Sequence, residues 1–152
     1  TRLLFARANF RERAGFFDLA EADYREILNL NPGDANALNA LGYALTNNTD
    51  RFAEAAGLLE QAISKDPRNP AIIDSLGWVY FKLGKDRQAE LLLKEAYKQY
   101  PDPEVAAHLI ELLWTLGREV EARDLIANQW RASPNNEHLR ETASRLAIPL
   151  PE

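Results

Sequence analysis

Residues 70–102 read PAIIDSLGWVYFKLGKDRQAELLLKEAYKQYPD and contain two helical patterns joined by a glycine turn. Over 73–80, apolar and small residues recur at three- and four-residue spacing, which places them on one face of a predicted helix. Gly84 interrupts this pattern, and a second helical face follows over 89–97 until Pro101 ends it. These residues therefore predict two antiparallel helices with small side chains where they cross.

The same arrangement recurs along the chain with a period close to 34 residues. One alanine opens each second helix and one proline ends it, and both sets of markers are spaced by 35, 34 and 33 residues. The prolines are Pro32, Pro67, Pro101 and Pro134, and the alanines are Ala20, Ala55, Ala89 and Ala122. Two independent markers with one period predict a repeat protein. The predicted units are four repeats over 1–34, 35–69, 70–102 and 103–136, a capping helix over 137–147 and a loose tail over 148–152.

These markers resemble those of the tetratricopeptide repeat (TPR) family, whose unit is a 34-residue helix–turn–helix. The pairs Leu41-Gly42 and Leu76-Gly77 carry the resemblance over residues 1–136, together with the four opening alanines and the later Ala62 and Ala96. The resemblance implies an all-α fold, the TPR α-solenoid. This is a right-handed superhelix of antiparallel helix pairs, here closed by a C-terminal capping helix, with the first helix of each pair on the concave face.

The first and fourth repeats depart from the family pattern. In the first repeat, Arg7-Ala8 replaces the usual Leu-Gly, and Arg11 replaces a packing aromatic residue. A charge in place of a packing leucine predicts a worn, or weakened, first helix, which marks either an end of the array or a face that once met an earlier repeat. In the fourth repeat, Ile110 replaces the crossing glycine and Gln129 replaces the second alanine, so we expect looser packing there.

Composition and motifs exclude several classes of function. Apolar residues make up 46% of the chain and charged residues 27%, a balance that is typical of a folded domain. The net charge of −5 and the lack of a long Lys/Arg run argue against nucleic-acid binding. The chain has no cysteine, which excludes disulfides and thiolate metal sites, and no apolar run approaches the ~20 residues that span a bilayer. With two histidines and no catalytic or phosphate-binding motif, we expect no enzyme, no cofactor and no metal.

The candidate binding residues occupy first-helix positions that the packing pattern leaves unused. They are Asn39, Tyr43, Asp74, Trp78, Phe81, Lys82, Glu111 and Trp114. Aromatic side chains anchor interfaces and amides pair with a peptide backbone, so the set predicts a concave groove for a protein or peptide partner. In the alternative, Trp78 and Trp114 pack against the next helix or the terminal cap.

One binding mode of TPR proteins is disfavoured by the residues present. Some members of the family hold the terminal carboxylate of chaperones with a Lys/Asn/Arg clamp, and only Asn9 matches that clamp here. The lysine and arginine are absent, and the nearby Asp74 would repel a carboxylate.

Two phrases carry a closer resemblance, ALNALGYALTNNTDRFAEA over 37–55 and NPAIIDSLGWVYFKLG over 69–84. They resemble the C-terminal repeats of bacterial outer-membrane TPR lipoproteins. Some of these are adaptors that bind a periplasmic carboxy-terminal processing protease and its cell-wall hydrolase substrates. The resemblance implies a periplasmic, non-catalytic adaptor whose full-length form is anchored in the outer membrane; a cytoplasmic location is the alternative. No lipobox cysteine is present, and the helical pattern already includes Thr1, so we expect a piece of a longer protein.

Two other functions stay open. A homo-oligomerising structural module of a larger TPR protein would use the worn first helix and the tail as interfaces. An enzyme would need a deep polar pocket around His108.

Overall fold

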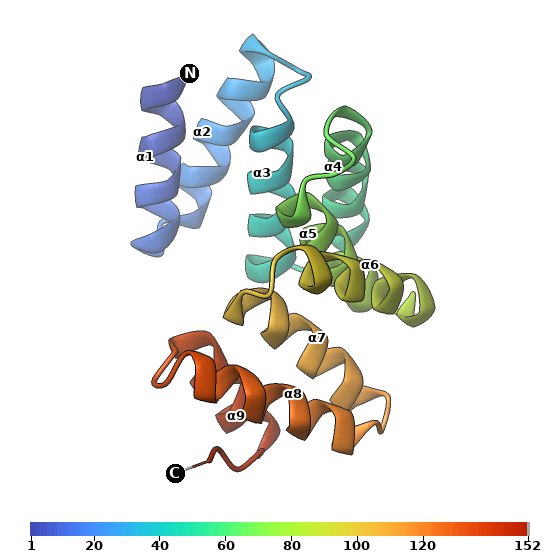
Figure 1. Ribbon diagram of the computed structural model, residues 1–152. Coiled ribbons are helices and arrows are strands. Elements are labelled where there is room, and N and C mark those ends of the chain that lie inside the picture. Colours follow the sequence, from blue (N-terminus) through green and yellow to red (C-terminus); the bar gives the residue numbers. More distant parts are fainter. Residues whose placement is uncertain (152) are drawn as a thin grey trace.

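A computed structural model describes residues 1–151, in which nine α-helices and no strands are present (Figure 1). The helices are α1 (Arg2–Arg13), α2 (Phe17–Leu30), α3 (Ala35–Asn48), α4 (Phe52–Lys65), α5 (Pro70–Lys82), α6 (Asp86–Gln99), α7 (Pro103–Thr115), α8 (Glu119–Ala132) and α9 (Glu137–Leu146). The predicted all-α class is confirmed. None of these helices is both long and apolar enough to cross a membrane.

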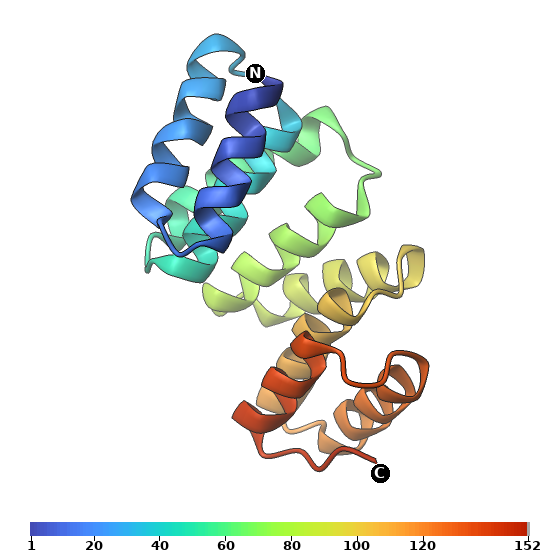
Figure 2. The ribbon, with the colours of Figure 1, turned by 90° about the vertical axis from the view of Figure 1, so that its left-hand side faces the viewer.

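The helices stack as consecutive pairs into an elongated, curved array. Within a pair, α1 packs on α2, α3 on α4, α5 on α6 and α7 on α8, and α9 packs on α7 and α8. The odd-numbered helices also contact one another in order from α3 to α9 and so form a continuous inner layer. The two termini lie at opposite ends of the stack (Figures 1 and 2).

Short-range signals set where the inner helices begin. The helices α3, α5, α7 and α9 each start at a side chain that accepts a hydrogen bond from a backbone N–H of the first turn. These capping residues are Asp34, Asn69, Asp102 and Asn136. In the turn after α5, Gly84 has a φ of +75°, a conformation that costs glycine little.

Two glycines allow the helices of a pair to cross closely. A Cβ atom placed on Gly42 would lie 2.6 Å from Leu59 Cγ, and one on Gly77 would lie 2.9 Å from Leu93 Cγ. Both leucines are fully buried and have little freedom to move away. The Leu-Gly pairs of the sequence therefore mark steric contacts between α3 and α4 and between α5 and α6.

The prediction of a worn first helix is wrong for its two arginines, because both pair with a carboxylate on α2. Asp23 is 2% exposed, and Arg7 donates to it from Nε at 3.0 Å and from Nη2 at 2.6 Å. Arg11 Nη1 donates to the same carboxylate at 2.7 Å. The charge that replaces the packing leucine is therefore neutralised within the first repeat.

This ion-pair cluster makes the stability of the protein depend on pH. The hydrogen bond from Arg7 lowers the pKa of Asp23 and outweighs burial, which would raise it. Because the folded-state pKa of Asp23 is lowered, its ionised carboxylate stabilises the protein fully at pH values above the unfolded-state pKa of about 3.9. This stabilisation is lost as the pH falls through the folded-state pKa. We expect Asp23→Asn to reduce the free energy of unfolding by more than about 1 kcal/mol at pH 6, and the difference to shrink towards pH 3.

Urea unfolding from pH 6 to pH 3 measures this difference. The matched control is Asp124→Asn, which removes an exposed carboxylate of α8. A loss for Asp23→Asn that does not change with pH would contradict the ion-pair explanation.

The predicted loose tail is wrong at Ile148, which is 4% exposed. Ala147 adopts the left-handed conformation at the end of α9 and turns the chain back. The N–H of Ile148 then donates to the carbonyl of Ala143 at 2.9 Å, and the side chain joins the C-terminal apolar core. The tail prediction at Glu152 lies outside the described residues.

Candidate functional site

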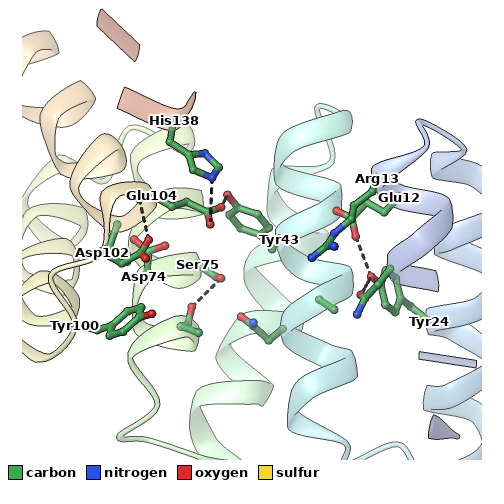
Figure 3. Close-up of a pocket in the computed structure, with 15 residues that line it drawn as sticks. Glu12, Arg13, Tyr24, Tyr43, Asp74, Ser75, Tyr100, Asp102, Glu104 and His138 are labelled. Carbon is green, nitrogen blue, oxygen red and sulfur yellow. Dashed lines mark hydrogen bonds and ion pairs between the residues drawn. The ribbon is translucent and has the colours of Figure 1, made fainter. Parts of the chain in front are cut away.

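The inner helices enclose a groove of about 670 Å³ on the concave side of the array (Figure 3). Its walls receive side chains from α1, α2, α3, α5, α7 and α9 and from the loop before α7. We call this the main groove. Figure 3 shows Glu12 and Tyr24 at one side of it and Asp74, Asp102 and Glu104 at the other.

Tyr43 bridges the concave face from α3 to α7. Its hydroxyl donates to Glu104 Oε1 at 2.6 Å, across 61 residues of sequence. Burial, followed by the nearby Glu104 charge, raises the pKa of Tyr43, so the phenol keeps its proton and remains a donor at neutral pH. Beyond this bridge lies a second hollow of about 200 Å³, which we call the minor hollow and which Trp78, His108 and Glu111 line.

His108 lies at the centre of a buried polar cluster that joins three inner helices. Its Nδ1 is 2.9 Å from Asp74 Oδ2 on α5, and its Nε2 is 3.3 Å from the Tyr43 hydroxyl. Since an ionised carboxylate only accepts hydrogen bonds, Nδ1 carries a proton. The imidazole also stacks on Trp78, with ring centroids 4.3 Å apart and planes inclined by 20°.

The enzyme alternative required a polar pocket at His108, and a polar cluster is present there. Among the described residues, however, the hydrogen-bond partners of His108 are Asp74 and Tyr43, and no Ser, Thr or Cys nucleophile is among them. Trp78 covers one face of the ring. Within residues 1–151, no group of three or more His, Asp or Glu side chains is arranged to hold a metal ion.

The structure divides the predicted site residues into three groups. Asn39, Tyr43 and Asp74 line the main groove, and Trp78 and Glu111 line the minor hollow, which Tyr43 also borders. Phe81, Lys82 and Trp114 line neither. Among the first group, Asn39 Oδ1 is buried and has no hydrogen-bond partner within residues 1–151.

The interpretation of Trp78 as a residue of the binding groove is wrong, because this side chain packs within the chain, as the alternative interpretation proposed. The side chain is 6% exposed, and its Nε1 donates to Asn47 Oδ1 at 3.0 Å. The Lys82 ammonium lies 4.3 Å from the Trp78 ring centroid, and the Phe81 ring centroid lies 5.6 Å away. These three predicted site residues therefore support one another more than they offer a surface to a partner.

Trp114 and Glu111 also have partners within the chain. Trp114 is half-buried against the C-terminal core, with the Arg123 guanidinium 5.2 Å from its ring centroid. Glu111 accepts two hydrogen bonds from Arg145 of α9, at 2.6 and 2.8 Å. The capping helix therefore reaches into the concave side, which the sequence did not indicate.

Sequence reasoning missed several residues of the main groove. Tyr24 comes from the second helix α2, yet its hydroxyl donates towards Asn9 at 2.7 Å and Glu12 at 2.8 Å. Glu12 lies on a first helix, so helical spacing alone could have included it. Tyr24 carried no such signal, because its ring is buried between the helices of its pair.

The main groove is acidic. Four carboxylates line it, namely Glu12, Asp74, Asp102 and Glu104. The groove also has Arg13 and the imidazole of His138, whose Nε2 is 3.9 Å from Glu104. Burial raises the pKa of Glu12, and the hydrogen bond from Tyr24 opposes this shift. The groups around Glu12 therefore only partly offset the cost of burying its negative charge.

Comparison with known proteins gives similar repeats along most of the chain. Two protein-family models, both described as tetratricopeptide repeat, match residues 5–70 and 49–109 of this chain. The TPR repeat-containing protein PA4667 of Pseudomonas aeruginosa is 43% identical over 109 residues, which is 72% of this chain. The chain spans only 18% of the length of that relative.

Solved structures share the arrangement of helices. The TPR protein TTC0263 of Thermus thermophilus is 25% identical, with a TM-score of 0.81, over 96% of this chain and 80% of that one. PilF of Pseudomonas aeruginosa is 24% identical, with a TM-score of 0.70, over 95% of this chain and 66% of that one. The O-GlcNAc transferase of Thermobaculum terrenum is 23% identical, with a TM-score of 0.78, over 86% of this chain and 26% of that one.

Proposed function

The chain belongs to the tetratricopeptide repeat family, and from this premise we propose that it is a protein-interaction scaffold whose main groove holds an extended peptide segment of a partner. TPR proteins generally mediate protein–protein interaction, and this fold typically serves as a non-catalytic scaffold. The observation that carries the proposal is the groove of about 670 Å³, which is lined by side chains from six of the nine helices in residues 1–151.

The floor and rim of the groove suit a peptide main chain. Ala40 and Ala71 leave room where larger side chains would fill the space. Asn9 and Asn39 carry amide N–H groups, which can donate to the carbonyl groups of a peptide. Tyr100 is 56% exposed at the rim, where an aromatic ring can cover a partner side chain.

Filling the groove is expected to abolish binding without unfolding the protein. Ala71 is exposed and lines the groove, so Ala71→Trp adds bulk there at little cost to the core. For peptides selected from a displayed random library against the unmodified chain, we expect Ala71→Trp to raise Kd more than about tenfold, roughly 1.4 kcal/mol of binding free energy. Fluorescence anisotropy measures this change, and thermal unfolding checks the fold.

The matched control is Ala53→Trp, which adds the same side chain on an exposed position of α4 outside the groove. It is expected to bind the selected peptides as the unmodified chain does. If both variants bind equally well, the partner site lies elsewhere on the array.

We further propose, as the more specific form of this function, that the scaffold links a periplasmic carboxy-terminal processing protease to cell-wall hydrolase substrates. The chain would then lie in the periplasm, within a longer protein anchored in the outer membrane. The support is the resemblance of residues 37–55 and 69–84 to adaptors of that kind. The relative from Pseudomonas aeruginosa supports membership of the repeat family.

The second candidate function is a homo-oligomerising module. One observation favours it: Leu3 and Phe10 of α1 are 86% and 69% exposed and lie seven residues apart, on one side of the terminal helix. Sedimentation velocity distinguishes the candidates. A mass that rises with concentration supports self-association, and a monomer at all concentrations rules it out.

A further inference from the structure

Among the described residues, the carboxylates of the main groove have no Lys or Arg partner, whereas several carboxylates elsewhere on the protein do. Outside the groove, Asp23, Glu21, Glu54, Glu90 and Glu111 each form ion pairs with arginine. Within residues 1–151, no lysine or arginine forms an ion pair with any of the four groove carboxylates. The groove therefore has negative charge that the chain does not neutralise by direct contact.

Each groove carboxylate is instead held in place by a neutral donor or an imidazole. Glu12 accepts from the Tyr24 hydroxyl at 2.8 Å, and Glu104 accepts from the Tyr43 hydroxyl at 2.6 Å. Asp102 accepts the N–H of Glu104 at 2.9 Å as the cap of α7. Hydrogen bonds of this kind fix the position of an acceptor while leaving lone pairs available for a further donor.

The carboxylates stand at both ends of the groove, as Figure 3 shows. Glu12 lies on α1 at one end, and Asp102 and Glu104 lie beside the start of α7 at the other. Tyr43 and Tyr100 flank the latter end and present aromatic rings near the carboxylates. A cation that is desolvated beside both a carboxylate and an aromatic ring gains from each contact.

We propose that the occupant of the main groove is an extended segment that carries at least two Lys or Arg side chains, one directed to Glu12 and another to Asp102 and Glu104. This inference rests on the proposed function and adds the chemistry of the partner. An acidic segment or a terminal carboxylate would approach four carboxylates in a groove whose lining includes a single Lys or Arg side chain, Arg13, so its binding is disfavoured. The aliphatic stems of Lys and Arg pack on the alanine floor while their charged ends reach the carboxylates.

Three fluorescein-labelled ten-residue peptides test the inference by anisotropy. They share alternate alanines and carry Lys, Gln or Glu at the other positions. We expect the Lys peptide to bind at least tenfold more tightly than the Gln peptide, and the Glu peptide to bind more weakly than both. We also expect the advantage of the Lys peptide to fall as salt is raised, because ions screen charges at an open groove.

A charge-matched pair of variants locates the effect. Glu12→Gln/Asp102→Asn/Glu104→Gln removes three charges and retains the acceptors for Tyr24, Tyr43 and the α7 cap. Asp18→Asn/Glu95→Gln/Glu119→Gln removes three exposed carboxylates outside the groove, so both variants change the net charge from −5 to −2. We expect the groove variant to weaken Lys-peptide binding at least tenfold, and the other variant by less than threefold.

The outcomes separate this inference from the proposed function. Equal losses in the two variants would overturn it, because the effect would then follow net charge alone. If the Gln peptide binds as tightly as the Lys peptide and Ala71→Trp blocks both, the groove binds peptides and the preference for cations is wrong. If none of the three peptides binds, while library peptides do bind and Ala71→Trp blocks them, the cationic chemistry again fails and the scaffold function stands. If the library also yields no binder, both proposals fail.

Discussion

Trp78→Ala is expected to lower the free energy of unfolding by about 3–5 kcal/mol, the range for truncating a buried large aromatic side chain. The substitution removes the stacking partner of His108 and leaves Asn47 without the indole donor. It also opens a cavity between α3, α5 and α7, the three helices that the Tyr43–His108–Asp74 cluster joins. At about 2–4 °C per kcal/mol for a chain of this size, we expect the melting temperature to fall by roughly 6–20 °C.

Tyr100→Ala provides the control for this prediction, because Tyr100 lines the main groove but is 56% exposed. It is expected to change the free energy of unfolding by less than about 1 kcal/mol and to affect peptide binding instead. Urea unfolding of both variants measures the contrast. If Trp78→Ala retains full stability and loses only peptide binding, then Trp78 is a contact for the partner and the packing assignment is wrong.

Gly77→Leu is expected to reduce stability by about 3 kcal/mol or more, at the upper end of what overpacking a close-packed interior costs. The Cβ alone would lie 2.9 Å from Leu93 Cγ, 3.0 Å from Leu93 Cδ2 and 3.1 Å from Leu92 Cβ. The further atoms of a leucine would have to push α5 and α6 apart. Because neighbouring repeats stabilise each other, we expect the loss to appear as unfolding of the array or as a broad, low-temperature transition.

Gly77→Ala and Gly57→Ala separate crowding from helix propensity. Alanine is favoured over glycine in a helix interior by about 1 kcal/mol, so both substitutions would stabilise the protein if propensity alone mattered. Gly57 lies within α4, and nothing would lie within 4 Å of its new Cβ, so Gly57→Ala should raise stability. Gly77→Ala should lower it. A gain in both variants, measured by denaturant unfolding, would show that the crossing of α5 and α6 relaxes freely.

The helices and their pairing could be predicted from the sequence because their signals are local. Asp34 and Asn69 cap the helices that follow them, and Gly84 supplies the left-handed turn between α5 and α6. The period of the proline and alanine markers indicated the TPR-like solenoid, and the likeness to solved TPR structures confirms that class. The division of the chain into repeats 1–34, 35–69, 70–102 and 103–136 remains a prediction of that period.

The candidate site could be predicted only in part. Helical spacing selected Asn39, Tyr43 and Asp74, which line the main groove, and their contact with a partner remains a prediction. The same spacing cannot distinguish a side chain that faces an open groove from one that faces the next inner helix. Trp78 is of the second kind, because α3 and α7 both approach α5 at its position.

Sequence alone determined the secondary structure, the repeat period and the small residues at the crossings, since each of these depends on residues within about one repeat. Only the tertiary structure decided which concave side chains meet. Tyr43 and Glu104 are 61 residues apart and bond across the face, and Arg145 of the cap reaches Glu111. Each helix pair is rotated slightly relative to the next, and these rotations add up to the curvature of the stack. The curvature brings inner helices that are distant in sequence together. It also leaves the acidic main groove open between α1 and α7, a property that no single repeat contains.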